Sequence, residues 1–195
     1  YEVLLVVDAI ENVKDKIHKY DLPITLIESG EATVGKKRNM GLNLAKGDYV
    51  YFLDSDDYVL PNCLNALIEE AQKSNNQVVA GKRMVSWFKK QVFETMSDET
   101  NIERNLKDKD HDRLEQFKID LLIRTRHALR NVSCLNLLIK RSLIEDNHIS
   151  FKEEFFWYTD APFVVGLLKY TNDVSFVEDA ILVKRKHNDP INRPA

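Results

Sequence analysis

The sequence predicts an α/β fold in which helices flank both faces of a mostly parallel sheet. Three observations support this prediction. Short apolar runs alternate with amphipathic stretches along the first half of the chain. The first run, residues 1–7 (YEVLLVV), is almost continuously apolar, as in a strand that is buried on both faces. The composition, with 44% apolar and 30% charged residues in a chain of 195, is typical of a soluble domain with a substantial core.

The first half of the chain is predicted to have the element order βαβαβ. The expected strands cover residues 1–7, 24–28 and 49–53, and the expected helices cover residues 11–20 and 33–46. Strands joined by helices in this way form a parallel sheet, whose ligands bind beyond the carboxyl ends of the strands. Two of these ends carry acids, namely Asp8 and the run Asp54-Ser55-Asp56-Asp57. We therefore expect a binding site at this edge of the sheet.

The pattern changes after this acidic run. A helix is expected over residues 61–74 and a strand over residues 77–80, followed by a β-like pattern over residues 84–93. Residues 101–130 have a long, charged, helical pattern. Its basic amphipathic face comprises Ile119, Leu122, Ile123, Arg124, Arg126 and Arg130. This face fits contact with an acceptor or a membrane surface, and a helix packed on the domain is the alternative.

Composition and charge exclude several classes of protein. The sequence has no run of about 18 apolar residues and no signal-peptide pattern, so we expect a cytosolic chain without a membrane span. The net charge of −3 argues against nucleic acid as the main partner. Cys63 and Cys134 are too few for a disulfide framework and have no metal-ligand spacing, so they are expected to be buried thiols.

A nucleoside-triphosphate loop is the first candidate motif. Gly30, Gly35 and Lys36 have the spacing of that loop, between an apolar run and a helical pattern. A true loop of this kind has Ser or Thr after its lysine to bind magnesium, and this chain has Lys37. An NTPase is therefore only a remote alternative.

Residues 34–64, VGKKRNMGLNLAKGDYVYFLDSDDYVLPNCL, carry a more specific resemblance. They are similar to the sugar-nucleotide half of family 2 glycosyltransferases, in which an Arg-Asn-x-Gly helix is followed by Ala-Lys-Gly-Asp, an apolar strand and Asp-x-Asp-Asp. The resemblance covers residues 1–80 and 134–190. It implies a GT-A fold, which is a Rossmann-like three-layer α/β/α domain. Residues 1–195 would then form one domain, with a nucleotide-sugar-binding half over 1–82 and an acceptor-binding half over 83–195.

The resemblance implies an inverting enzyme that moves a sugar from a nucleotide diphosphate, with UDP as the expected nucleotide, to an acceptor hydroxyl. The diphosphate leaving group needs a divalent cation, and carboxylates suit Mn²⁺ or Mg²⁺. Asp54 and Asp56 alternate by two residues, so their side chains can point the same way in an extended backbone. By resemblance, Asp56 is the direct metal ligand and Asp54 contacts ribose or metal-bound water. The alternative is a solvated turn that caps the next helix.

Two residues of the nucleotide half are expected to contact the donor. The guanidinium of Arg38 matches diphosphate oxygens, and an exposed helical arginine is the alternative. Asp8 stands where the family has an acid that contacts the base or ribose. Val7 and Ala9 depart from the family pattern there.

The second half is expected to supply the catalytic base. Asp160 follows a run of aromatic residues and precedes an apolar helical face, and by resemblance it accepts the proton of the acceptor hydroxyl. The family has Glu-Asp at this point, whereas this chain has Thr159-Asp160. The alternative is that Asp160 caps the helix. Glu153 and Glu154 are the reserve candidates for the base.

The tail over residues 184–192 (KRKHNDPIN) contains the last two candidates. By resemblance, Arg185 contacts the diphosphate and His187 completes the metal shell, and a solvated basic tail is the alternative. The tail is also similar to glycosyltransferase domains of bacterial teichoic-acid and capsule synthases. That similarity implies a glycan, polyol-phosphate or lipid-linked acceptor, and peripheral contact with the inner face of the plasma membrane. The possibility that these 195 residues are a fragment of a longer protein is left open.

A non-catalytic glycan-binding or polymer-binding module is the competing function. The departures at Val7, Ala9 and Thr159 favour it.

Overall fold

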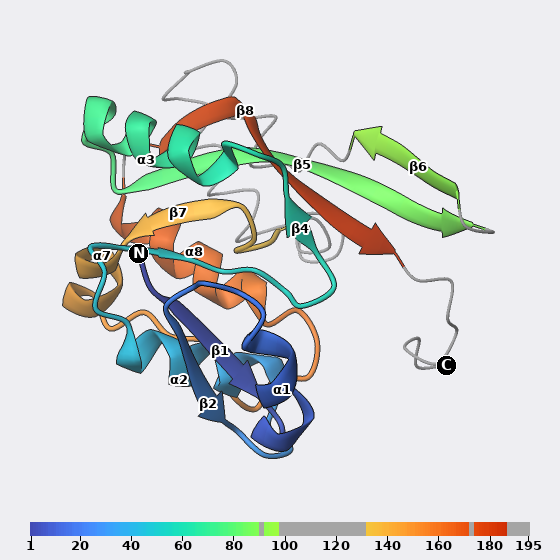
Figure 1. Cartoon of the computed structure of the whole chain (residues 1–195). Coiled ribbons are helices and arrows are strands. Elements are labelled where there is room, and N and C mark those ends of the chain that lie inside the picture. The colour runs from blue at the N-terminus through green and yellow to red at the C-terminus, as the bar shows by residue number, and fades with distance from the viewer. Residues whose placement is uncertain (90–91, 98–131, 172–173, 187–195) are drawn as a thin grey trace. The chain divides into compact units, whose positions relative to one another are not determined.

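A computed structural model describes residues 1–89, 92–97, 132–171 and 174–186 (Figure 1). These residues form two compact units. Unit 1 contains residues 1–50, 132–134 and 139–171, and unit 2 contains residues 51–89, 92–97, 135–138 and 174–186. The predicted helical stretch at residues 101–130 lies outside the described residues.

Unit 1 begins with two parallel strands. β1 (Val3–Val7) pairs with β2 (Ile24–Glu28) from Val3 opposite Ile24 to Val7 opposite Glu28. This confirms the predicted strand over residues 24–28. The helix expected over residues 11–20 is instead a 3₁₀ turn, η1 (Ile10–Asn12), followed by α1 (Lys14–Ile17). No residue of α1 is buried, so packing cannot stabilise a longer helix there.

The second helix of unit 1, α2 (Val34–Leu44), agrees with the helix predicted over residues 33–46. Thr33 caps it, because the Thr33 hydroxyl accepts a hydrogen bond from the backbone N–H of Lys36 at 3.3 Å. After the helix, the backbone N–H groups of Lys46 and Gly47 donate to the Glu2 carboxylate at 2.7 and 3.1 Å. These bonds join the end of α2 to the start of β1.

Two further helices complete unit 1. They are α7 (Arg141–Asp146) and α8 (Asp160–Tyr170). The buried residues of α8 are Ala161, Phe163, Val164, Leu167 and Leu168. The Phe163 ring stacks on Phe151 with ring centroids 4.0 Å apart. The apolar face predicted for this segment is therefore confirmed as part of the core of unit 1.

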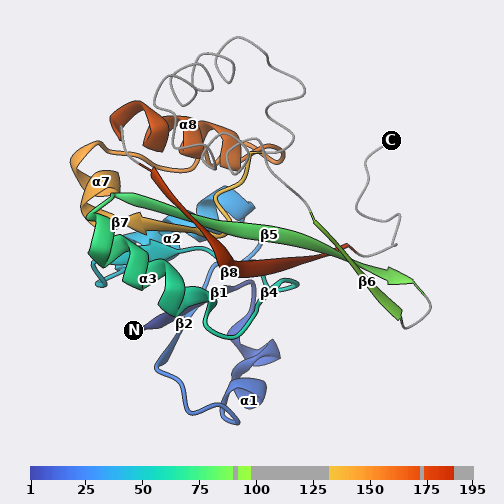
Figure 2. The ribbon, with the colours of Figure 1, turned by 90° about the horizontal axis from the view of Figure 1, so that it is seen from above.

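Most residues of a mixed sheet belong to unit 2. The sheet has the strand order β3-β7-β5-β8-β4, with β6 paired to β5. The strands are β3 (Tyr49–Tyr51), β4 (Tyr58–Val59), β5 (Val78–Lys89), β6 (Val92–Ser97), β7 (Leu137–Lys140) and β8 (Val174–Lys186). β5 and β8 are parallel, and the pairs β4–β8 and β5–β6 are antiparallel. Figure 2 shows β5 and β8 running side by side, with α3 (Cys63–Ser74) next to them.

The predicted βαβαβ strands are divided between two sheets. β1 and β2 pair with each other, whereas β3 belongs to the six-stranded sheet. The next residue after β3, Phe52, forms a parallel bridge with Leu135, from the second half of the chain. Local patterns cannot reveal a pairing over that separation, because they contain only neighbouring residues.

Helix α3 confirms the prediction over residues 61–74, apart from its first two residues. Asn62 precedes the helix in a left-handed conformation with φ of 67°. Leu67 and Ala71 of this helix are buried, whereas Leu64 and Ile68 are exposed. Both Cys63 and Cys134 are buried free thiols, as predicted. Within the described ranges, no helix has the length and apolar character needed to cross a membrane.

Candidate functional site

The acidic run after β3 forms a cluster in unit 2. Asp54, Asp56 and Asp57 each offer a carboxylate oxygen, and these oxygens lie within 4.8 Å of one another. Asp57 is buried, Asp54 is half-buried and Asp56 is exposed. Hard oxygen ligands at this spacing suit a divalent cation such as Mg²⁺ or Mn²⁺. The predicted metal residue Asp56 and donor residue Asp54 therefore lie together.

Asp57 is a member of this cluster to which the sequence assigned no role. Its Oδ1 accepts a hydrogen bond from the backbone N–H of Arg185 at 2.9 Å. Its Oδ2 is buried and has no hydrogen-bond partner among the described residues. Burial raises the pKa of Asp57, and the nearby charges of Asp56 and Asp54 raise it further, against the lowering effect of Arg185 and Lys184. A bound cation would offset the cost of this buried oxygen, which is about 1–3 kcal/mol for an unsatisfied polar group.

Arg185 lies beside the acidic cluster, near the end of β8. Besides its backbone bond to Asp57, its side-chain Nε donates to the backbone carbonyl of Asp56. Both contacts join residues almost 130 positions apart in the sequence, with separations of 128 and 129. The structure therefore brings together the predicted donor residue Arg185 and the predicted metal residue Asp56. His187 lies outside the described residues.

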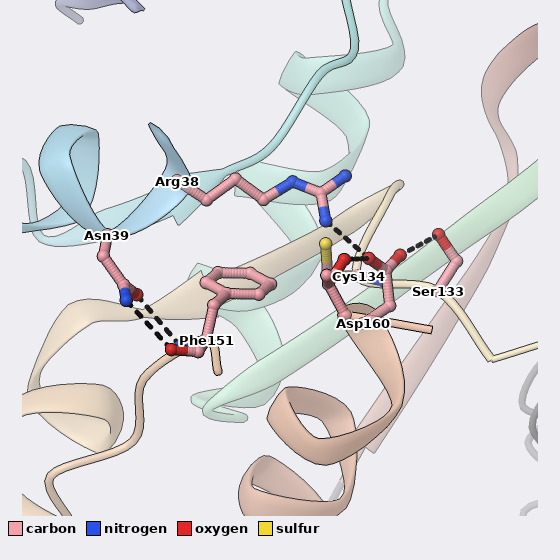
Figure 3. Close-up of polar contacts among 7 residues, drawn as sticks. Arg38, Asn39, Ser133, Cys134, Phe151 and Asp160 are labelled. Carbon is pink, nitrogen blue, oxygen red and sulfur yellow. Dashed lines mark hydrogen bonds and ion pairs between the residues drawn. The ribbon is translucent and has the colours of Figure 1, made fainter. Parts of the chain in front are cut away.

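Unit 1 holds a second group of candidates, centred on an ion pair (Figure 3). The Arg38 Nη1 of α2 lies 2.5 Å from the Asp160 Oδ1 of α8, and the side chains are only 11% and 18% exposed. The Arg38 guanidinium also lies over the Phe151 ring, 5.3 Å from its centroid. The alternative interpretation of Arg38 as an exposed helical residue is therefore wrong.

Asp160 has hydrogen-bond partners on both carboxylate oxygens. Besides the Arg38 bond at Oδ1, its Oδ2 accepts from the Ser133 hydroxyl at 2.9 Å and from the Cys134 backbone N–H at 3.1 Å. Burial raises the pKa of Asp160, but the Arg38 charge and these hydrogen bonds lower the pKa more, so it lies below its usual value. The carboxylate is therefore ionised at neutral pH.

The helix-cap interpretation of Asp160 is wrong. Asp160 is the first residue of α8, the capping position belongs to Thr159, and neither residue is part of a side-chain cap bond at this helix. The Asp160 carboxylate instead bonds to α2 and to the segment at residues 133–134.

Asn39, next to Arg38, has a role that the sequence did not predict. Its buried amide donates from Nδ2 to the Phe151 carbonyl at 2.9 Å, and its Oδ1 accepts from the Phe151 N–H at 2.9 Å (Figure 3). The same Nδ2 donates to the Glu153 Oε1 at 3.0 Å. The Asn39 amide thus bonds to the N–H and the carbonyl of Phe151 as the backbone of a neighbouring β-strand would. Phe151 lies in the segment that leads to Asp160. Its place in the Arg-Asn-x-Gly element was the signal that could have pointed to it.

Asp8 is the remaining donor candidate. It follows β1, and its Oδ1 lies 2.6 Å from the Lys37 Nζ. Lys37, which replaces the Ser or Thr of a triphosphate loop, is instead paired with Asp8. Much of the Asp8 side chain is exposed, so this pair stabilises the fold by at most about 1 kcal/mol. The Asp8 carboxylate remains accessible to solvent.

These features define the class of protein. The architecture, with acids that follow a β-strand, is the GT-A fold of glycosyltransferases. The sequence model of Glycosyl transferase family 2 matches residues 1–145, and the chain belongs to that family.

Named relatives agree with this assignment. The poly(ribitol-phosphate) beta-N-acetylglucosaminyltransferase TarP of Staphylococcus aureus is 27% identical over 151 residues, which cover 77% of this chain and 40% of TarP. The uncharacterized glycosyltransferase EpsJ of Bacillus subtilis is 23% identical over 191 residues, which cover 95% of this chain and 53% of EpsJ.

A solved structure has the same fold. The crystal structure of Staphylococcus aureus TarS 1–349 in complex with UDP-GlcNAc aligns with a TM-score of 0.61 at 20% sequence identity. The alignment covers 97% of this chain and 50% of that chain. This chain therefore spans about half the length, or less, of TarP, EpsJ and the TarS structure.

Proposed function

We propose that the protein transfers a sugar from a UDP-sugar to an acceptor hydroxyl, with inversion at the anomeric carbon, in the synthesis of a bacterial cell-surface polysaccharide or teichoic acid. Membership of family 2 supports the reaction type. The name of the relative TarP and the UDP-GlcNAc complex of TarS support the donor and a polyol-phosphate or glycan acceptor. The observation that carries the proposal is the cluster of carboxylates at Asp54, Asp56 and Asp57.

The acidic cluster would hold Mn²⁺ or Mg²⁺, with Asp56 as direct ligand and with His187 as a further ligand. The cation would neutralise the negative charge that develops on the diphosphate as the bond to the sugar breaks. Asp54 contacts ribose or metal-bound water, and Arg185 and Arg38 contribute positive charge toward the diphosphate. Asp8, with its exposed carboxylate, contacts the base or ribose.

Asp160 is the proposed general base. Inversion by a single displacement requires a carboxylate within about 3 Å of the acceptor hydroxyl to take its proton. Arg38 and Ser133 orient Asp160 and keep it ionised, which a base requires. A lowered pKa also makes Asp160 a weak base. The proton therefore moves late, after the attacking oxygen has become more acidic.

The metal proposal is tested by titrating Mn²⁺ in the presence of UDP. Asp56→Ala should weaken UDP binding in the presence of Mn²⁺ at least tenfold. Its circular dichroism spectrum should be the same as that of the unaltered protein. Asp48→Ala is a matched control, because Asp48 is an exposed aspartate outside the cluster. Equal UDP affinity of the unaltered protein with Mn²⁺ and with a chelator would contradict the metal site.

The catalytic proposal is tested by UDP release from UDP-sugars, with and without acceptor. Asp160→Asn should keep UDP and Mn²⁺ binding and lower turnover about a hundredfold or more. Near-normal transfer by this variant would remove Asp160 from the mechanism. If the unaltered protein binds glycan but releases no UDP from any UDP-sugar, the non-catalytic module is the better assignment.

The place of action follows from the proposed substrates and is also a proposal. We assign the protein to the cytoplasm, with peripheral contact at the inner face of the plasma membrane for a lipid-linked acceptor. Co-sedimentation with liposomes tests this contact, and binding that is independent of anionic lipid content would count against an electrostatic attachment.

A further inference from the structure

Four consecutive aromatic residues are exposed in the segment before α8. The exposed fractions of Phe155, Phe156, Trp157 and Tyr158 are 41%, 78%, 58% and 57%. Single exposed apolar residues are common, but adjacent aromatic side chains that do not enter a core indicate a binding surface. We call residues 155–158 the aromatic segment.

The aromatic segment starts from an anchored stretch of backbone. The Thr33 hydroxyl donates to the Glu153 carbonyl at 2.8 Å, and Asn39 bonds to both backbone groups of Phe151. Gly35 allows close packing here, because a Cβ on Gly35 would lie 2.8 Å from the Lys152 carbonyl oxygen. Helix α2 therefore fixes the backbone immediately before the exposed aromatics.

The other end of the aromatic segment is also fixed. Tyr158 has a left-handed backbone with φ of 56°, which costs a non-glycine residue about 1–2 kcal/mol. Its carbonyl accepts a hydrogen bond from the Ala161 N–H at 3.2 Å. Two residues later, Asp160 is held by Arg38, Ser133 and the Cys134 backbone. The segment is thus attached at both ends, and its aromatic side chains lie between these two attachments.

We propose that the aromatic segment binds neutral sugar rings of the acceptor. The inference rests on the proposed function and names the acceptor subsite next to the proposed base. Flat aromatic faces pack against the C–H faces of a sugar ring, and this contact needs no charge on the ligand. Glu154 is exposed and its carboxylate can accept hydrogen bonds from sugar hydroxyls, whereas Oε1 of Glu153 already accepts from Asn39. A sugar held by Tyr158 would lie close to Asp160, because only Thr159 separates them.

Local charge favours a neutral sugar over an anionic surface. The exposed residues 152–154 contribute one lysine and two glutamates, so the approach to the aromatic segment is mildly acidic. Segments that attach to anionic membranes instead combine aromatics with lysine and arginine. A phosphate-rich polymer would be repelled for the same reason. The segment therefore matches the sugar residues of a glycan rather than lipid headgroups or polyol phosphate.

Direct binding can be measured on Trp157. The chain has two tryptophans, so the protein labelled with 5-fluorotryptophan gives two ¹⁹F resonances, and Trp157→Phe assigns one of them. Millimolar maltohexaose, cellohexaose or chitohexaose should shift the Trp157 resonance in a saturable way. Phe156→Ala should weaken this binding at least fivefold, and the control Tyr20→Ala, which alters another exposed aromatic of unit 1, should not.

The same experiment distinguishes other ligands. A saturable response to vesicles of phosphatidylglycerol and phosphatidylcholine, or to ribitol-phosphate oligomers, without a response to the neutral oligosaccharides would overturn the inference. A lack of response to all of these probes would also overturn it.

A kinetic measurement separates this inference from the proposed function. The double variant Phe156→Ala/Trp157→Ala should raise the KM for the glycan acceptor about tenfold while UDP release without acceptor changes less than twofold. An unchanged KM would contradict the aromatic subsite even if transfer is confirmed. If the unaltered protein releases no UDP, the proposed function fails, and the ¹⁹F titration still decides whether the segment binds sugars.

Discussion

Asn39→Ala is the substitution for which the structure gives the clearest expectation. Asn39 is buried in α2, and its amide makes three hydrogen bonds, two to the backbone of Phe151 and one to Glu153. Alanine keeps the helix but removes every one of these bonds. The Phe151 N–H and carbonyl then lose their Asn39 partner in a region that excludes most water.

The magnitude follows from the three hydrogen bonds of the Asn39 amide, each of which contributes about 0.5–1.5 kcal/mol to stability. The higher helix propensity of alanine offsets about 0.5 kcal/mol of this loss. We therefore expect a net destabilisation of about 1–4 kcal/mol, which is a large part of the stability of an ordinary domain.

Two measurements check this expectation. Urea unfolding should give a lower midpoint for Asn39→Ala, and NMR hydrogen exchange at the Phe151 amide should accelerate by about a hundredfold, the equivalent of about 2.7 kcal/mol. Asn43→Ala is the matched control, because Asn43 is an exposed asparagine in the same helix. It should be neutral or slightly stabilising. If Asn39→Ala and Asn43→Ala unfold within about 0.5 kcal/mol of each other, the Asn39 amide does not anchor the segment.

Two further substitutions test the ion pair and the sheet of unit 2. Arg38→Met should lower the free energy of unfolding by about 2–4 kcal/mol at pH 7, because it leaves Asp160 buried without its cation. Since the folded-state pKa of Asp160 is depressed, its contribution is present above its ordinary pKa of about 3.9 and is lost as the pH falls through the folded value. The difference in the free energy of unfolding between Arg38→Met and the unaltered protein should therefore decrease from pH 7 to pH 3. A difference that does not depend on pH would contradict the ion pair. Gly81→Ala should impair folding, because its Cβ would overlap the Ala180 carbonyl and the Asn136 amide, whereas the control Gly41→Ala meets only Val6 at an ordinary 3.5 Å and should be tolerated in thermal unfolding.

The sequence predicted those elements whose packing is encoded locally. β2 and α2 have the expected bounds to within two residues. The apolar run of β2 and the capping residue Thr33 directly before α2 are signals that can be read from the local sequence. The helix expected over residues 11–20 shortened to α1, which buries nothing. The strand predicted over residues 77–80 extends to Lys89. Such boundaries depend on tertiary partners that a window of sequence does not contain.

The sequence allowed the candidate residues to be identified, but it did not show which of them contact one another. The acids at Asp54 and Asp56 could be recognised from their place after an apolar strand, and the structure places their carboxylates together. The bond between Arg38 and Asp160 spans 122 positions, so the sequence assigned each residue a separate ligand. No role was predicted for Asp57 from the sequence, because the burial of its carboxylate depends on tertiary structure. Arg185 of β8 bonds to Oδ1 of Asp57, and Oδ2 is buried.

The geometry of α2 explains why one short motif affects the whole segment at residues 151–160. Gly35, Arg38 and Asn39 have the spacing i, i+3 and i+4, which places them on one face of a helix. Gly35 lets that face approach Lys152, Asn39 holds Phe151, and Arg38 holds Asp160. The Arg-Asn pair therefore orients the proposed base and the start of the aromatic segment, in addition to any contact with the donor. The Asn39 side chain bonds to Phe151 and Glu153, whereas the charge of Arg38 is paired with Asp160, so the two substitutions should affect activity differently. Asn39→Ala should mainly raise the acceptor KM, whereas Arg38→Met should also shift the pH profile of kcat toward higher pH, as the Asp160 carboxyl loses the charge that lowers its pKa.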